Sequence, residues 1–191
     1  MFYSAIVEIL RTRKTDALDH QGDPSFWVVV PCKDQGWAIH FALVRPDSGP
    51  FSKIIGALTN SPVSHAEWEA TDFSPSEMVV RAELKLDLPY DLEEILRKAI
   101  NPNDVHHTEG KEFCSGMVYE IIKPDWPNLT PYPYPGLLMN QSASMLDVQL
   151  PKFAAHDIQI GQDELDFLTR AHDDGKIATG TFQEACGCLS L

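Results

Sequence analysis

The chain has 191 residues, a formal net charge of −13 and an isoelectric point near 4.8, and 43% of its residues are hydrophobic. This length predicts a single domain over residues 1–191, and the apolar fraction is enough for a sizeable core. The strong negative charge argues against nucleic acids and anionic membrane surfaces as partners. No apolar run approaches the ~20 residues that a membrane-spanning helix needs, so we expect no membrane span.

The N-terminal segment and the cysteines indicate the cellular compartment. The N-terminal MFYSAIVEILRTRK does not resemble a secretory signal, because Glu8 interrupts its apolar part and its basic residues follow that part. The four cysteines, at positions 32, 114, 186 and 188, have no regular spacing. Such irregular spacing is typical of a reducing compartment rather than of a disulfide framework. We therefore expect a cytoplasmic protein.

The first third of the chain predicts strands. Tyr3–Leu10 is short and apolar and fits either a strand or a helical turn, and the polar residues 11–25 predict a loop. β-Branched and aromatic residues over Phe26–Pro31 and Trp37–Arg45 predict two strands. His40 lies on the second of these, and we interpret it as a structural residue rather than a ligand.

A helix and a further strand follow. Residues 47–50 (Asp-Ser-Gly-Pro) resemble a helix start, and the apolar residues from Phe51 to Leu58 recur with helical spacing. Ser64–Asp72 then alternates strictly, with His65, Glu67 and Glu69 on its polar face. This alternation predicts a half-buried strand that carries a histidine on its polar side.

Met78–Leu84 also alternates, and the turn residues 73–76 (Phe-Ser-Pro-Ser) separate it from the strand before it. The two runs together predict an antiparallel hairpin. A turn centred near Ser74 would set Glu67 opposite Arg81 and Glu83 opposite His65, which supplies a carboxylate to orient the imidazole. A slip of two residues would keep both faces and change these partners.

A second helix and a polar loop come next. Asp91 followed by Glu94 is close to a capping box and predicts a helix through Ala99. Residues 101–110 form a polar loop that contains His106 and His107. Adjacent histidines can bind a metal ion, but no cysteine or carboxylate cluster at ligand spacing accompanies them. We therefore assign no metal and no cofactor.

Lys111–Pro124 predicts the helix on which the candidate site depends. Apolar residues recur there every four positions, and Cys114 falls in the first helical turn. Unpaired backbone N–H groups and the positive end of the helix dipole favour a thiolate at such a position. Gly116 would leave room for another backbone or a substrate to come close. Cys114 is therefore the best candidate nucleophile among the cysteines.

The last third of the chain is less informative. Pro124–Pro135 holds five prolines, at positions 124, 127, 131, 133 and 135, and can be neither helix nor central strand. It fits a stiff surface loop, a wall of a substrate groove or, less well, a proline-rich recognition segment. Residues 142–148 predict a short helix, Pro151–Ile160 a last strand, and Gln162–Ala171 a helix. The terminal Cys-Gly-Cys at 186–188 is too little for a zinc site.

The order of these elements resembles a known family. A helix (FSKIIGALTN), a strand opening SPVSHAEWEA, a helix opening FCSGMVYEII and a segment NQSASMLDVQLP follow one another over about residues 37–153. This order is similar to that of the permuted NlpC/P60 proteins, the YiiX-like and lecithin retinol acyltransferase-like branch of the papain-fold cysteine hydrolases. Glu67 stands where that family more often has a small or apolar residue. The N- and C-terminal extensions have no counterpart in the family.

These observations predict an α+β, papain-like fold in which an antiparallel sheet carrying His65 packs against the helix that begins near Cys114. The catalytic set would be Cys114 as nucleophile, His65 as base and Glu83 as its orienting group, with Glu67 and Glu69 as alternatives. The resemblance implies a hydrolase that cleaves an amide, in a peptide, isopeptide or peptidoglycan-like substrate, or an acyl ester or thioester. The alternative is a non-catalytic ligand- or protein-binding module on the same fold, in which Cys114 is incidental.

Overall fold

A computed structural model describes residues 8–11, 26–32, 36–147, 150 and 158–191. Over these residues the protein is α+β, with one four-stranded antiparallel sheet and seven helices. The strands are β1 (Glu8–Arg11), β2 (Phe26–Cys32), β3 (Trp37–Leu43) and β4 (Val63–Ala70). The helices are α1 (Pro50–Thr59), α2 (Ser76–Glu83), α3 (Leu92–Ile100), α4 (Cys114–Ile122), α5 (Pro135–Met145), α6 (Gln162–Asp173) and α7 (Thr179–Leu189).

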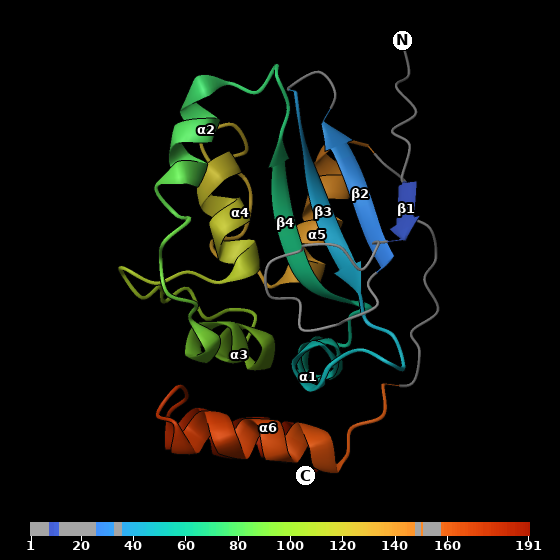
Figure 1. Ribbon diagram of the computed structural model, residues 1–191, viewed down its shortest axis with the longest axis vertical. Helices are drawn as coiled ribbons and strands as arrows, with labels where there is room; N and C mark the ends of the chain where they lie inside the picture. The colour runs from blue at the N-terminus through green and yellow to red at the C-terminus, as the bar shows by residue number, and fades with distance from the viewer. Residues whose placement is uncertain (1–7, 12–25, 33–35, 148–149, 151–157) are drawn as a thin grey trace.

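The sheet has the order β1-β2-β3-β4, so each strand pairs with its neighbour in sequence and β4 lies at an edge. The register sets Ala42 opposite His65 and His40 opposite Glu67, and a bulge follows Ala42. Figure 1 shows α2 and α4 beside β4, at the opposite side of the sheet from β1. The edge strand that carries His65 is therefore the strand nearest to the helix that begins with Cys114.

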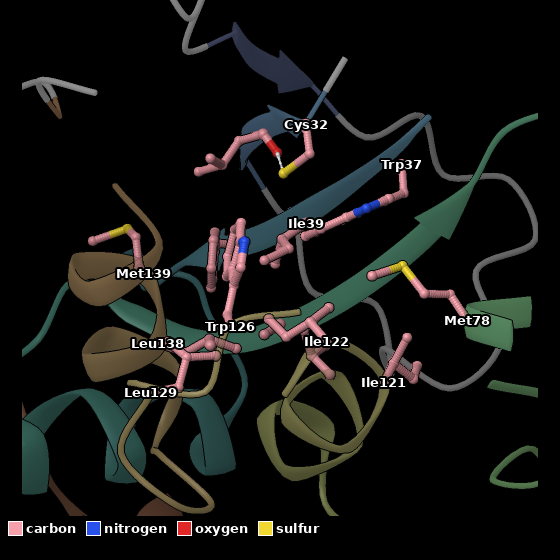
Figure 2. Packing of buried hydrophobic residues seen from close by; sticks show 14 of the residues in the cluster. Cys32, Trp37, Ile39, Met78, Ile121, Ile122, Trp126, Leu129, Leu138 and Met139 are labelled. Carbon is pink, nitrogen blue, oxygen red and sulfur yellow. Dashed lines mark hydrogen bonds between the residues drawn. The ribbon is translucent and has the colours of Figure 1, made fainter. Parts of the chain in front are cut away.

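A first hydrophobic core lies between the sheet and helices α4 and α5. Ile39 and Phe41 of β3 are fully buried there, together with Ile121 of α4 and Leu138 of α5. Figure 2 shows the side chains of α4 and α5 gathered beneath Ile39 and Trp37. Trp126 completes this core, with its ring centroid 5.2 Å from that of Trp37. Burial of these large apolar groups fixes α4 against the sheet.

A second core joins helices α1, α3, α6 and α7. Its buried members include Ile54 and Ile55 of α1, Leu96 of α3 and Leu168 of α6. Figure 1 shows α1, α3 and α6 together at one end of the molecule. Phe113, the residue before α4, is also buried in this core. The C-terminal helices therefore share a core with the central part of the chain.

Most of the predicted elements are confirmed. The strands predicted from residues 26, 37 and 64 are β2, β3 and β4, and the predicted helices near residues 50, 91, 111 and 162 are α1, α3, α4 and α6. The predicted helix at 142–148 is α5, which begins earlier, with Pro135 in its first turn. Helix α7 was not predicted from the sequence. Most of the loop predicted over 11–25, of the strand or helical turn predicted over 3–10 and of the strand predicted over 151–160 lies outside the described residues. Residues 8–11 form β1, and residues 158–160 are not in a strand.

The predicted hairpin partner of β4 is wrong, because residues 76–83 form helix α2. Over a run this short, apolar residues two apart and apolar residues four apart give similar patterns. The structure decides between them by burial: Met78 is buried and Ala82 packs against the first core, while Val80 and Leu84 are exposed. Glu83 is consequently the last residue of a helix and has no cross-strand relation to His65.

Replacing Gly36 tests the end of the sheet that supports β4. Gly36 has φ +71°, and a Cβ atom there would lie 2.5 Å from the backbone carbonyl of Phe73. Gly175 has a similar φ of +69° but nothing within 4 Å of such a Cβ atom. We expect Gly36→Ala to lower the free energy of unfolding by about 1–3 kcal/mol more than Gly175→Ala, because only the first adds a clash to the backbone strain. Equal losses in denaturant unfolding would contradict this packing.

Candidate functional site

Cys114 is the first residue of α4 and is only 5% exposed. The helix begins there because Phe113 adopts an extended conformation and its ring is buried in the second core. The ring also lies over the next turn, where a Cβ atom on Gly116 would come within 2.8 Å of it. The prediction that Gly116 leaves room for a substrate is therefore wrong, since the Phe113 ring occupies that space.

His65 of β4 contacts Cys114. Its imidazole is hydrogen-bonded to the Cys114 side chain, and its Nε2 atom lies 3.2 Å from Oε1 of Glu67. Because β4 is the edge strand, no further strand lies between His65 and the N-terminus of α4. The structure thus brings together the two principal residues that the sequence suggested.

Two further groups donate hydrogen bonds to the sulfur of Cys114. The first is the backbone N–H of Ala66, which is available because alternate N–H groups of an edge strand point away from the sheet. The second is the phenol of Tyr90, whose hydroxyl oxygen lies 3.9 Å from Sγ. Tyr90 itself is 48% exposed, so it forms part of the surface above the buried thiol.

These contacts determine the charges of the pair. Burial raises the pKa of Cys114, but attraction to His65 and the hydrogen bonds from His65, Ala66 and Tyr90 outweigh it, so that the pKa lies below its usual value. Burial lowers the pKa of His65, but the Cys114 thiolate and Glu67 raise it to about 9. At neutral pH both shifts favour a thiolate beside an imidazolium, the reactive state of a cysteine nucleophile.

Tyr90 was not found from the sequence, because its position depends on distant residues. The backbone N–H of Asp91 donates to the carbonyl of Glu112 at 2.8 Å, and the N–H of Glu112 donates to the carbonyl of Pro89 at 3.1 Å. These two bonds set Tyr90 beside Glu112, two residues before Cys114. Although part of the residue is exposed, its hydroxyl group is buried against Cys114. This burial raises the pKa of Tyr90, as does the neighbouring thiolate, so the phenol stays protonated and acts as a donor.

Glu67 takes the place that the sequence suggested for Glu83. The predicted contact required a strand at 78–84, and the structure has α2 there instead. Glu67 lies two residues after His65 on the same face of β4, and its long side chain reaches the imidazole. Glu69, the other alternative, pairs with His40 of β3 at 2.5 Å. The signal in the sequence that points to Glu67 is its position two residues after His65, on the same polar face of the strand.

The other cysteines lie away from this contact. Cys32 is buried on β2, where burial raises its pKa to about 12, and Cys186 and Cys188 lie on α7. Burial also raises the pKa of Cys186, while Cys188 is exposed. For Cys32 and Cys186 burial is the cause given for the raised pKa, which is the opposite of the shift at Cys114.

The two adjacent histidines belong to polar contacts behind the site. His107 binds the buried carboxylate of Glu94 at 3.1 Å, and His106 lies 3.1 Å from the guanidinium of Arg97. Across the described part of the chain, no group of three or more His, Cys, Asp or Glu side chains could hold a metal ion.

The proline-rich segment 124–135 is neither helix nor strand until α5 begins at its last residue. Its large side chains pack against the rest of the protein, and Trp126 and Leu129 are buried in the first core. The Tyr132 ring stacks on His107 at 4.0 Å, and its hydroxyl donates to Glu120 at 2.6 Å. These contacts describe a stiff loop that is packed onto the body of the protein.

Comparison with known proteins adds no assignment, since no family model, curated protein or solved structure matches the chain. Over the residues that the structure describes, none of the helices combines the length and the apolar character needed to cross a membrane.

The roles of Glu67 and Glu83 can be separated by replacing each with glutamine. The Glu67 carboxylate raises the pKa of His65, so Glu67→Gln should lower that pKa below about 9 and, by weakening the ion pair, raise the pKa of Cys114. Glu83→Gln should change neither value, because Glu83 lies at the end of α2. NMR titration of the imidazole and the ultraviolet absorbance of the thiolate measure the two shifts. A larger effect of Glu83→Gln would mean that Glu83, and not Glu67, orients the imidazole of His65.

Proposed function

We propose that this protein is a cysteine hydrolase in which Cys114 attacks a carbonyl carbon and His65 transfers protons. The single observation that carries the proposal is the environment of the Cys114 sulfur. It contacts an imidazole, a backbone N–H and a phenol, and its pKa lies below the usual range although the side chain is buried. An incidental buried cysteine has the opposite property, a raised pKa, as Cys32 does.

In the first half of the proposed reaction, the thiolate of Cys114 forms a bond to the carbonyl carbon of the substrate. The backbone N–H of Cys114, at the N-terminus of α4, helps to hold the negative oxygen of the tetrahedral intermediate. The imidazolium of His65 gives its proton to the leaving amine, alcohol or thiol as the carbon–leaving-group bond breaks. A covalent thioester on Cys114 and a neutral His65 result.

In the second half, neutral His65 takes a proton from a water molecule, whose oxygen attacks the thioester carbonyl. The carbon–sulfur bond then breaks, releasing a carboxylic acid and restoring the thiolate beside the imidazolium. Glu67 steadies the imidazole throughout, since its carboxylate lies 3.2 Å from Nε2. The substrate is therefore an amide, an acyl ester or a thioester.

The proposal extends to the fold family. The histidine strand precedes the cysteine helix in sequence, and the sheet edge packs beside the N-terminus of that helix. This arrangement supports a permuted papain-like domain of the NlpC/P60 type, in which the helices α6 and α7 are an addition. The substrate would then be a peptide, isopeptide, peptidoglycan-like or acyl compound that reaches Cys114 past the exposed side of Tyr90.

Labelling with an electrophile tests whether Cys114 is a nucleophile. Cys188 is exposed whereas Cys114 is buried, so accessibility alone would favour Cys188. We expect iodoacetamide at mildly acidic pH to modify Cys114 first, by roughly tenfold or more, because its contacts hold Cys114 as a thiolate. Mass spectrometry of the digested protein locates the label. Faster modification of Cys188 would favour the alternative, a binding module in which Cys114 is incidental.

Substitution tests the chemistry directly. Cys114→Ser should abolish turnover of an acyl-thioester or activated-ester probe, by roughly three orders of magnitude or more, with little change in melting temperature. The matched control is Cys188→Ser, which changes the same atoms at an exposed position and should leave turnover unchanged. Near-normal turnover in the Cys114→Ser protein would mean that the hydrolase proposal is wrong.

A further inference from the structure

Three aromatic rings connect the C-terminal helices to Cys114. Phe167 of α6 stacks on Phe51 of α1, with ring centroids 5.7 Å apart and planes 29° apart. Phe51 in turn meets the ring of Tyr90 edge to face, with centroids 6.2 Å apart. The Tyr90 hydroxyl lies 3.9 Å from Sγ of Cys114. These contacts therefore link α6, α1 and the segment before α3, and the last of them is with the sulfur of Cys114.

The helices α6 and α7 are anchored to the elements that flank Tyr90. Lys53 of α1 lies 3.7 Å from the buried carboxylate of Glu164 on α6. Glu93 of α3 accepts hydrogen bonds from the N–H of Ala178, at 2.7 Å, and from the hydroxyl of Thr181 at the start of α7. A carboxylate is stabilising at a helix N-terminus, where backbone donors are unpaired. The helix pair is thus fixed to α1, which carries Phe51, and to α3, which follows Tyr90.

The backbone and the ring of Tyr90 are held by different contacts. The hydrogen bonds between Pro89–Asp91 and Glu112 fix the main chain, but they leave the side-chain torsions of Tyr90 unspecified. With 48% of the residue exposed, solvent rather than protein lies against part of Tyr90. An edge-to-face contact such as that with Phe51 restricts the ring, and such pairs contribute beyond their buried area.

We propose that Phe167 is a positioning residue for the nucleophile: it holds Phe51, and Phe51 holds the Tyr90 ring with its hydroxyl against Cys114. The packing of the C-terminal helix pair would then control the reactivity of a thiol that lies on α4. This inference rests on the proposed function, because it takes Cys114 as the nucleophile. It gives a role to the C-terminal segment, which has no counterpart in the family that the rest of the chain resembles.

The measurable consequence is the reactivity of Cys114. Tyr90 donates to the thiolate, so loss of this contact should raise the pKa of the thiol and slow its alkylation at mildly acidic pH. The other titratable groups around this contact are His65, which faces Cys114, Glu67, which faces His65, and Asp91, which faces Tyr90. None of them is altered when Phe167 is replaced, so they form a constant background.

The experiment is a double-mutant cycle on the full chain, read as the alkylation rate of Cys114 against pH. Tyr90→Phe should lower the rate at mildly acidic pH by about tenfold, the effect of one hydrogen bond to a charged group. Phe167→Leu keeps the apolar bulk and removes the ring. It should also lower the rate, but by a smaller factor than Tyr90→Phe. In the Tyr90→Phe background, Phe167→Leu should have no further effect. Phe167→Tyr, which keeps the ring, should restore the rate.

Phe182→Leu is the matched control for loss of stability. Phe182 also belongs to the helix pair, but its ring meets His172 of α6, at 5.0 Å. We expect this variant to lower the melting temperature and to leave the alkylation profile unchanged. An equal loss of rate from Phe167→Leu with and without the Tyr90 hydroxyl, or no loss at all, would overturn the positioning role alone. If Cys114 of the unaltered protein reacts no faster than Cys188, both this inference and the proposed function are wrong.

Discussion

The constraint on which the site depends is the cost of keeping a sulfur anion out of water. Burial alone raises the pKa of a thiol, as it does at Cys32, and Cys114 is also buried. Its pKa is nevertheless lowered, because an imidazolium, a backbone N–H and a phenol replace the lost water. These donors come from β4 and from the segment before α3, and the helix N-terminus supplies its own N–H groups. The fold must therefore bring a sheet edge, a helix start and a loop to one point, and the two hydrophobic cores hold these elements together.

Placing the orienting carboxylate on the same strand as the histidine has a physical advantage. Glu67 and His65 are two residues apart on one face of β4, so their relation does not depend on the register of a neighbouring strand. The Glu67 side chain is 43% exposed, and solvent screens its charge, so the interaction contributes more to the orientation of the imidazole than to the stability of the fold. His40 and Glu69 form a similar pair on the adjoining strands. The polar face of the sheet edge is thus organised by histidine–carboxylate pairs.

The sequence predicted those parts of the site that depend on local periodicity. Alternation identified the strand of His65, and four-residue spacing identified the helix of Cys114, because in both cases one face is buried by the first core. The same method failed at α2, where a run of eight residues is too short for two periodicities to differ. It could not find Tyr90 either. The contact of Tyr90 with Cys114 arises from backbone pairing with Glu112 and from the ring of Phe51, and neither leaves a pattern in the sequence around residue 90.

The overall charge and the local charges of the site act in opposite directions. A net charge of −13 disfavours any further anion, including the thiolate of Cys114. At physiological ionic strength, however, charges farther away than about 8 Å are largely screened, whereas contacts within hydrogen-bond distance are not.

Behind the site, Glu112 is buried with its carboxylate 2.5 Å from Lys85, and Glu94 is buried beside Lys98. Such buried pairs add little net stability, since desolvation offsets their attraction. Each of these buried carboxylates is thus compensated by a neighbouring ammonium group, and the contacts that lower the pKa of Cys114 are those with His65, Ala66 and Tyr90.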